Sequence, residues 1–409
     1  MSNIGIVTTW FERGAAYVSR QIMEQLTHDG LNVFIYARGG ESYAKGDPVW
    51  DKDYVTWSVI KNSPMPTDID KKHFFRWIDS NSINTIIFNE QQYWQPVVWA
   101  KEKNVKTIAY IDYYKENNID IFQLYDQLWC NTKRHFSVFY QHLDCRYIPW
   151  GTNTDIYKVD NRVIGEKIRF FHSAGMNPYR KGCDIFIEAV FKLSKITNNF
   201  ECIIHSQVDV QQLFPHLSEK IRALTKDGLL TIINKTVQAP GLYHMGDVYV
   251  YPSRLEGIGL TIVEALSCSL PVITTDEPPM NEFVDSTHSR TIKILKRYSR
   301  ADGYYWPMAI ASSEDLTQSL LYFINNFQDI EIFQSRAREF ALKNLDWSKN
   351  AKKLRACILE CKFRELAPSL ARKAFILDNN TLPFFNKFLP LYRVAFSIAK
   401  KFKYQLMLK

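Results

Sequence analysis

The stretch that decides the fold is YVYPSRLEGIGLTIVEALSCSLPVITT, residues 249–275. It starts as an apolar strand, passes through a loop that contains Gly257 and Gly259, and continues near Leu260 as an amphipathic helix carrying Glu264. A strand, a glycine-containing loop and a helix in this order are typical of parallel sheets covered by helices. The first N–H groups of such a helix and its positive dipole end attract phosphate.

Two glutamates frame this loop. Glu256 precedes the loop and Glu264 follows eight residues later, inside the predicted helix. A carboxylate beside a phosphate-binding loop can accept hydrogen bonds from sugar hydroxyls. The stretch therefore predicts a nucleotide-diphosphate site whose loop residues are Gly257, Ile258, Gly259 and Leu260.

Short β-rich segments alternate with helical patterns on both sides of this stretch, which predicts an α/β protein with two Rossmann-like domains. We assign residues 1–150 to an amino-terminal domain and residues 151–345 to a second domain. Since ligands of such sheets bind beyond the carboxyl ends of the strands, two of these domains facing each other would enclose a cleft.

The chain has 409 residues and a net charge of +8. Residues 362–409 hold ten Lys or Arg against two acids, so this tail accounts for the whole net charge. Residues 1–361 therefore carry no net charge, which argues against a nucleic-acid groove on the folded body. The first residues lack the features of a signal peptide, and no apolar run is long enough to span a membrane. We expect a cytoplasmic protein.

Seven cysteines are scattered without the spacing of a disulfide framework, which predicts reduced thiols. Cys357 and Cys361 stand one helical turn apart, but no second pair or nearby histidine completes a zinc site. We therefore expect no metal.

Four segments in order resemble a GT-B glycosyltransferase of glycosyltransferase family 4, over roughly residues 1–360. They are IPWGTNTDIYK (148–158), HSAGMNPYRKGCDIFIEAV (172–190), GDVYVYPSRLEGIGLTIVEALSCSLPVITT (246–275) and DWSKNAKKLRACI (346–358). The resemblance implies retention of anomeric configuration without a metal, and no cofactor beyond the nucleotide-sugar donor. It implies that Lys181 neutralises the donor diphosphate, assisted by the N–H groups of Gly259 and Leu260. Glu264 would bind ribose hydroxyls and Glu256 would hold the donor sugar. The resemblance also implies that residues 1–150 are the acceptor-side domain and residues 151–345 the nucleotide-sugar domain. Residues 346–361 would then form a helix that crosses back to the amino-terminal domain.

The chain departs from that family in three places. An Arg usual about six residues before the Lys is missing, and Arg180 is the candidate substitute. Ser269 stands where a glycine commonly closes the helix after the second glutamate. Serine adopts the left-handed backbone conformation of that position less easily than glycine does. The usual histidine of the amino-terminal domain is also missing. Asp112 and Glu90 follow predicted strands there, and either could steady the sugar carbon or accept the acceptor's proton.

Two further positions resemble the family. Gly14 lies between the first strand and helix, where the family has a glycine-bearing loop near the donor phosphates or the acceptor. A single glycine is not a dinucleotide fingerprint. Glu282 resembles a recurrent acidic position with a packing or helix-cap role.

The tail interleaves aromatic and basic residues, which is typical of a helix lying in the headgroup plane of an anionic membrane. The alternative is a helix packed on its own protein with its lysines in water. The residues concerned are Phe384, Phe385, Phe388, Leu389, Tyr392, Phe396, Ile398 and Phe402, with Lys387, Arg393, Lys400, Lys401 and Lys403.

The sequence thus predicts a glycosyltransferase at the inner face of the membrane, acting on a glycan or lipid-linked acceptor in surface polysaccharide or glycolipid synthesis. Two alternatives stay open. One is a nucleotide-sugar epimerase or phosphorylase of the same shape. The other is a non-catalytic module that binds nucleotide sugar or a membrane surface.

Overall fold

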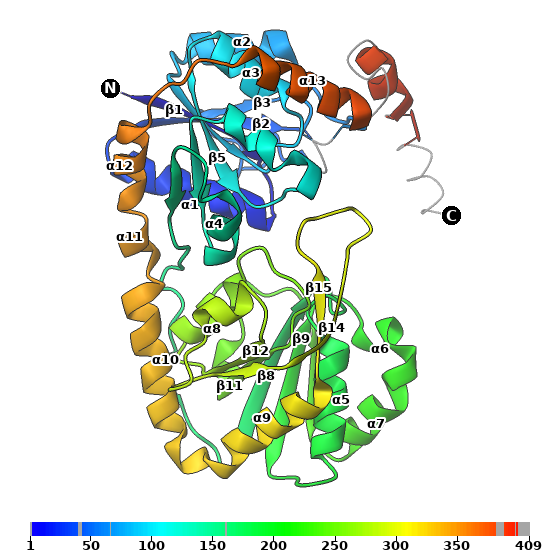
Figure 1. Cartoon of the computed structure of the whole chain (residues 1–409). Coiled ribbons are helices and arrows are strands. Elements are labelled where there is room, and N and C mark those ends of the chain that lie inside the picture. Colours follow the sequence, from blue (N-terminus) through cyan, green and yellow to red (C-terminus); the bar gives the residue numbers. More distant parts are fainter. Residues whose placement is uncertain are drawn as a thin grey trace. The chain divides into compact units, whose positions relative to one another are not determined.

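The computed structural model describes residues 2–39, 43–65, 67–159, 162–381, 388–396 and 398–399. The chain forms two compact units (Figure 1). Unit 1 comprises Met1–Asn131, His135–Ile148 and Ala351–Lys409, and unit 2 comprises Thr132–Arg134 and Pro149–Asn350.

Unit 1 is built on a seven-stranded parallel sheet with the strand order β3-β2-β1-β4-β5-β6-β7. The strands are β1 (Asn3–Thr9), β2 (Asn32–Arg38), β3 (Val55–Trp57), β4 (Thr85–Asn89), β5 (Lys106–Ile111), β6 (Gln127–Cys130) and β7 (Cys145–Tyr147). Its helices are α1 (Gly14–His28), α2 (Lys71–Ser80), α3 (Gln95–Glu102), most of α4 (Lys133–Phe139), α12 (Lys353–Glu360) and α13 (Pro368–Thr381), with the short 3-10 helices η1 (Glu116–Asn118) and η2 (Asp120–Leu124).

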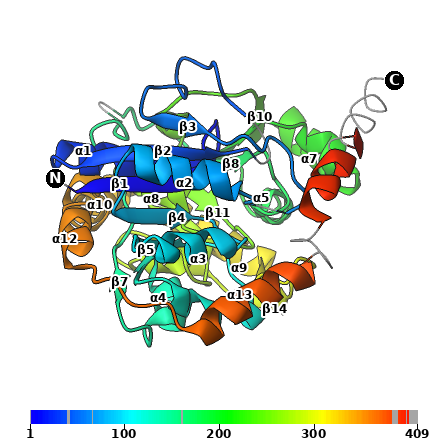
Figure 2. The same ribbon diagram turned by 90° about the horizontal axis from the view of Figure 1, so that it is seen from above.

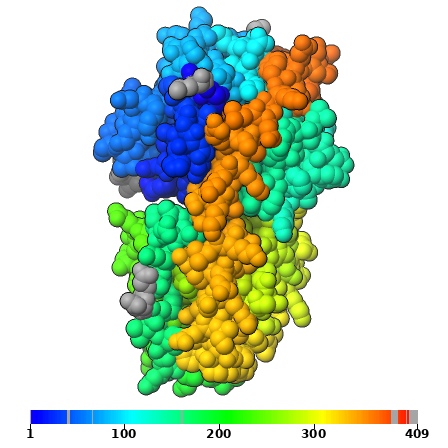
Figure 3. Space-filling view, turned by 90° about the vertical axis from the view of Figure 1, so that its left-hand side faces the viewer, coloured from blue at the N-terminus to red at the C-terminus, as the bar shows by residue number. Residues whose placement is uncertain are grey.

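The last two helices of the chain belong to this first unit. Helix α12 lies against α1, and both can be seen on the surface in Figure 3. Helix α13 runs along α3, as the view of Figure 2 shows. The contact is polar as well as apolar, because buried Asp378 accepts hydrogen bonds from the Trp94 and Gln95 N–H groups at 3.0 and 3.1 Å. This carboxylate satisfies donors that the start of α3 would otherwise leave open.

Unit 2 is built on a six-stranded parallel sheet with the order β10-β9-β8-β11-β12-β13. The strands are β8 (Ile168–Gly175), β9 (Phe200–Ser206), β10 (Leu230–Asn234), β11 (Val248–Tyr251), β12 (Val272–Thr275) and β13 (Arg290–Ile292). Its helices are α5 (Cys183–Leu193), α6 (Val210–Leu213), α7 (Ser218–Lys226), α8 (Leu260–Ser267), α9 (Ser313–Asn325), α10 (Ile330–Asn344) and α11 (Trp347–Asn350), with the 3-10 helices η3 (Pro215–Leu217), η4 (Tyr243–Met245), η5 (Met280–Phe283) and η6 (Phe327–Asp329).

Strand β11 shows how the sequence divides the core of unit 2. Successive side chains of a strand point to opposite faces of the sheet. Val248 and Val250 accordingly join one apolar cluster with residues of α5, α7 and α9. Tyr249 and Tyr251 join the other cluster with residues of α8 and α10. Both faces are covered, which explains the nearly unbroken apolar character of the strands.

A separate antiparallel hairpin joins β13 to α9 and was not predicted from the sequence. It consists of β14 (Ile294–Tyr298) and β15 (Met308–Ala311), with Tyr298 opposite Met308. Its connecting loop is visible in yellow above β14 and β15 in Figure 1.

Candidate active site

The strand order of unit 2 fixes where its loops converge. Strands β8 and β11 are neighbours, and the chain proceeds from β8 toward one edge of the sheet and from β11 toward the other. Ligands of open parallel sheets bind at this kind of switch point, beyond the carboxyl ends of the strands. The loop after β8 carries Arg180 and Lys181, and the loop after β11 carries Glu256.

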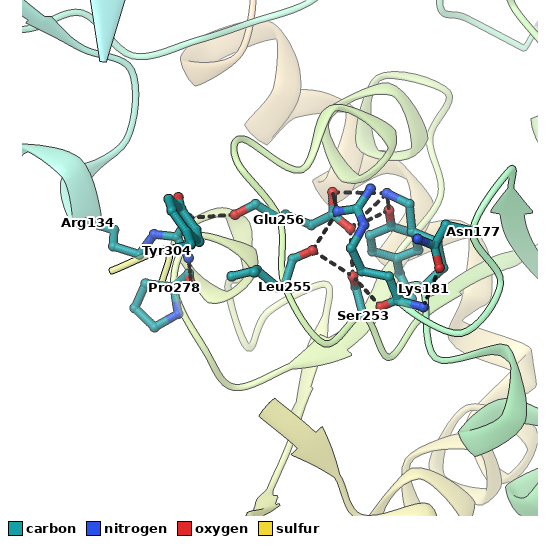
Figure 4. Close-up of polar contacts among 10 residues, drawn as sticks. Arg134, Asn177, Lys181, Ser253, Leu255, Glu256, Pro278 and Tyr304 are labelled. Atoms are coloured by element: carbon teal, nitrogen blue, oxygen red, sulfur yellow. Dashed lines mark hydrogen bonds and ion pairs between the residues drawn. The ribbon is translucent and has the colours of Figure 1, made fainter. Parts of the chain in front are cut away.

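The structure brings these side chains together, as Figure 4 shows for Lys181 and Glu256. Lys181 Nζ donates to Glu256 Oε1 and Oε2 at 2.7 and 2.9 Å. Arg180 Nη1 lies 3.2 Å from Glu256 Oε2 and donates to the Leu255 carbonyl at 2.7 Å. The two adjacent basic side chains therefore reach the same carboxylate.

Hydroxyl groups complete the surroundings of Glu256, which is only 6% exposed. Ser253 Oγ and Tyr251 Oη donate to Glu256 Oε1 at 2.6 and 2.9 Å. Lys181 also donates to the Tyr251 hydroxyl and lies over the Tyr251 ring, 5.0 Å from its centroid. Neither Ser253 nor Tyr251 was singled out from the sequence. The only signal was their position next to Glu256 in the deciding stretch.

The two partners of the ion pair both have lowered pKa values, for different reasons. Burial lowers the pKa of Lys181 to about 8, and Glu256 only partly opposes this effect. For Glu256, burial alone would raise the pKa, but Lys181 and Arg180 together outweigh burial and lower it to about 2. Both groups are therefore charged at neutral pH.

At two loop positions the backbone geometry requires glycine. Gly182 follows Lys181 with φ +75°, and a Cβ there would lie 2.0 Å from the Pro252 carbonyl oxygen. The loops after β8 and β11 can approach this closely only because residue 182 has no side chain. Gly259 has φ +88° and immediately precedes α8, so the loop turns directly into the helix. The N–H groups of Gly259 and Leu260 thus stand at the positive end of that helix.

Glu264 lies on α8 in different surroundings from Glu256. It accepts a hydrogen bond from Tyr243 Oη at 2.6 Å, and Tyr157 is a second hydrogen-bonding partner. Burial raises the pKa of Glu264 to about 6 despite these two bonds. The two tyrosines were missed by the sequence analysis, because they are distant in the chain and follow no local pattern.

A pocket of about 160 Å³ adjoins Glu264. Its walls come from β8, β9, the segment before η4 and the start of α8. Glu264 and Tyr243 line it, together with Ser173, His205 and Thr261. A pocket that combines aromatic walls with a few polar groups is suited to a planar ligand group.

The remaining candidates divide between the units. Glu282 accepts hydrogen bonds from the Lys133 and Arg134 N–H groups at 2.7 and 2.8 Å, so it caps the first residues of α4. Ser269 has φ +61°, the left-handed conformation expected where a glycine is usual.

Asp112, Glu90 and Gly14 belong to unit 1 and are described within it. Glu90 and Asp112 directly follow the neighbouring parallel strands β4 and β5, so both lie at one edge of the sheet. Glu90 has φ +54° and pairs with Arg13 at 3.7 Å. Arg38, which is buried, donates to the Asn89 carbonyl at 2.8 Å and thereby supports this turn. Gly14 begins α1, and a Cβ at this position would meet nothing within 4 Å.

Comparisons with known proteins concern both the sequence and the fold. Residues 167–299 match the family described as glycosyl transferases group 1. This match lies within unit 2. The match covers β8 to β14 and so includes Lys181, Glu256 and Glu264.

Relatives and solved structures extend the likeness. The lipopolysaccharide core biosynthesis mannosyltransferase LpsB of Rhizobium meliloti is 28% identical over 133 residues, which are 31% of this chain and 37% of that protein. The chain spans about a third of the length of the curated relatives it matches.

Solved structures are similar over almost their whole length. A glycosyltransferase from Rickettsia africae has a TM-score of 0.71 at 16% identity, covering 88% of this chain and 99% of that one. HepE of Anabaena, solved with UDP and glucose, has a TM-score of 0.64 at 13% identity, covering 88% and 100%. The chain therefore has the GT-B fold, with two Rossmann-like units.

Within the residues that the structure describes, no three His, Cys, Asp or Glu side chains are grouped so as to hold a metal ion. Over the same residues, no helix is both long and apolar enough to cross a bilayer.

Proposed function

We propose that the chain is a glycosyltransferase that moves a sugar from a nucleotide-sugar donor to a glycan or lipid-linked glycan. The observation that carries the proposal is the convergence of Lys181 and Glu256 at the switch point of unit 2, beside α8 with Glu264. A cation, a helix start and two carboxylates in separate surroundings supply what a sugar nucleotide requires. The match of residues 167–299 to the group 1 family supports it.

In this proposal each group acts on a different part of the donor. Lys181 binds the diphosphate, and the N–H groups of Gly259 and Leu260 stabilise the charge that develops on it when the sugar–phosphate bond breaks. Glu264 accepts hydrogen bonds from the ribose hydroxyls, and the pocket beside it holds the base. Glu256 holds the donor sugar. The nucleoside diphosphate leaves with the electron pair, and the acceptor oxygen forms the new bond to the sugar carbon.

The proposed reaction uses no metal, because Lys181, Arg180 and the start of α8 supply positive charge at the leaving group. We also propose that it retains the anomeric configuration, as the resemblance to glycosyltransferase family 4 implies. On the acceptor side we propose Asp112 or Glu90 as the carboxylate that steadies the sugar carbon or accepts the proton of the acceptor hydroxyl. Their location after neighbouring strands of one parallel sheet supports this choice.

We further propose that the protein attaches to the cytoplasmic face of an anionic membrane through residues 362–409, in surface polysaccharide or glycolipid synthesis. The described part of the tail packs on the rest of unit 1 and also exposes apolar side chains. Asp378 accepts a hydrogen bond from the Trp94 N–H group, and Arg393 pairs with Asp68 at 2.9 Å. Phe375 and Ile376 are 49% and 46% exposed.

Of the tail residues singled out from the sequence, Phe388, Phe396 and Ile398 are exposed, whereas Leu389 is buried. Tyr392 and Arg393 are half-buried. The others lie outside the described residues: Phe384, Phe385, Lys387, Lys400, Lys401, Phe402 and Lys403.

Release of nucleoside diphosphate from a panel of UDP- and GDP-sugars, with and without saccharide acceptors, tests the reaction. Lys181→Ala and Glu264→Ala should abolish transfer while leaving the folded state intact by circular dichroism. Lys192→Ala is the matched control, because Lys192 is a half-buried lysine of α5 that pairs with Glu314. Full transfer by both site variants would contradict the proposal.

The same assay separates the alternatives. An epimerase would convert the donor without releasing nucleoside diphosphate, and a phosphorylase would consume donor only with phosphate present. A binding module would bind the donor without any turnover.

A further inference from the structure

The hairpin β14–β15 is firmly attached beside the candidate active site. The N–H group of Ala309 on β15 donates to the Arg254 carbonyl at 2.8 Å, two residues before Glu256. On β14, Arg297 pairs with Glu277 at 2.7 Å. The hairpin is therefore connected both to the loop after β11 and to the loop after β12.

The loop of the hairpin, SRADGYYWP (299–307), has its own internal order. Arg300 pairs with Asp302, and Asp302 also accepts a hydrogen bond from the Tyr304 N–H group at 3.2 Å. Gly303 provides the left-handed turn, with φ +75°. These contacts fix the three consecutive aromatic residues Tyr304, Tyr305 and Trp306 at the end of the loop.

Arg134 connects this aromatic group to the backbone of Glu256, as Figure 4 shows. Its guanidinium donates to the Glu256 carbonyl at 2.5 Å and to the Pro278 carbonyl at 2.7 Å. It also contacts the Tyr304 hydroxyl at 3.5 Å and lies 5.0 Å from the centre of the Trp306 ring. A single buried cation thus positions the loop next to the residue assigned to the donor sugar.

The two last aromatic residues are accessible. Tyr305 is 39% exposed and Trp306 is half-buried, and their rings meet edge to face at 5.1 Å. Aromatic rings offer a large, rigid and apolar surface that matches the C–H face of a pyranose. We propose that Tyr305 and Trp306 form a subsite in unit 2 for the sugar ring of the acceptor, in addition to the acceptor-side carboxylate proposed in unit 1, so that the enzyme accepts saccharides rather than a bare lipid phosphate. This inference rests on the proposed function.

The charges around the loop favour a neutral sugar over a phosphate. Arg134 is committed to two carbonyl oxygens and a hydroxyl, and Arg300 to Asp302. The base pocket beside Glu264 has a different lining, with neither Tyr305 nor Trp306 among its residues. The aromatic pair is therefore distinct from the donor's base site.

The test compares acceptors that share one alkyl chain. Octyl glucoside, galactoside, mannoside and N-acetylglucosaminide are offered with the donor that the wild type hydrolyses, and octyl phosphate is the non-saccharide probe. In Tyr305→Ala and Trp306→Ala, the KM for the octyl glycoside should rise about tenfold, the size of one lost stacking contact. The KM for the donor should change less than about twofold.

Two further variants distinguish the loss of a sugar-binding contact from a general disturbance of the hairpin. Trp306→Phe keeps a ring and should restore most of the acceptor affinity. Leu295→Ala removes a side chain of β14 that is 69% exposed and should match the wild type.

Three results would overturn the inference. They are an acceptor KM within twofold of the wild type in both alanine variants, preference for octyl phosphate over every glycoside, and donor hydrolysis that no glycoside stimulates. A wild type that releases nucleoside diphosphate from no donor would overturn the proposed function itself.

Discussion

The affinity for a nucleoside diphosphate should depend on pH through Lys181. Burial holds the pKa of this lysine at about 8 in the unliganded protein, against an ordinary value of 10.5. A bound diphosphate favours the charged amine and should return its pKa to about the ordinary value. Binding above pH 8 therefore takes up a proton, and the affinity falls as the pH rises.

The size of the effect follows from the shift. A difference of 10.5 minus 8, or 2.5 pKa units, limits the loss to about 300-fold at high pH. Between pH 7 and pH 9.5 the dissociation constant should increase by about thirtyfold. The ligand adds little over this range, because a phosphate group with a second pKa near 6 is already about 90% ionised at pH 7.

Isothermal titration of UDP at pH 7, 8, 9 and 9.5 measures this dependence, and buffers of different ionisation enthalpy report the proton uptake. Lys181→Arg should bind with a dissociation constant that is nearly independent of pH, because arginine stays charged throughout. Lys192→Met should behave as the wild type. A wild-type change below threefold, or the same decline in Lys181→Arg, would refute the reasoning.

Three other perturbations have definite expected results. Glu264→Gln should weaken UDP binding and make the free energy of unfolding less dependent on pH. Because the folded-state pKa of Glu264 is raised from 4.5 to about 6, the wild type loses about 2 kcal/mol of stability as the pH rises through this interval. Urea unfolding at pH 4.5 and 7 measures this loss. Gly182→Ala should lower the free energy of unfolding by more than about 2 kcal/mol, whereas Gly175→Ala, with φ +56° and no atom within 4 Å of the added Cβ, should cost about 1 kcal/mol. Truncation after Leu382 should reduce co-sedimentation with phosphatidylserine vesicles at low salt but not at high salt, and unchanged binding would show that the tail is only structural.

The sequence predicted the parts of the site that are local. One stretch contains the strand, the loop and the helix, so the relation between Glu256, Gly259 and Glu264 follows from hydrophobic pattern and glycine positions. The left-handed conformation of Ser269 and the capping contacts of Glu282 also agree with local reasoning.

The parts that depend on long-range packing were not predictable. Tyr243 reaches Glu264 only because η4 and α8 pack on the same face of the sheet. Arg134 precedes Glu256 by 122 positions, and no pattern near either residue indicates their contact. The hairpin β14–β15 was missed because β14, with the sequence ILKRY, carries exposed charged side chains where a core strand has an apolar run.

The division of the chain has a consequence for its biosynthesis. Unit 2 is nearly continuous, whereas unit 1 takes α12 and α13 from residues that follow the whole of unit 2. On the ribosome, the second unit can therefore complete its core while the first still lacks the helix whose Asp378 caps α3. Unit 1 is therefore completed only after unit 2, when α12 and α13 have been synthesised.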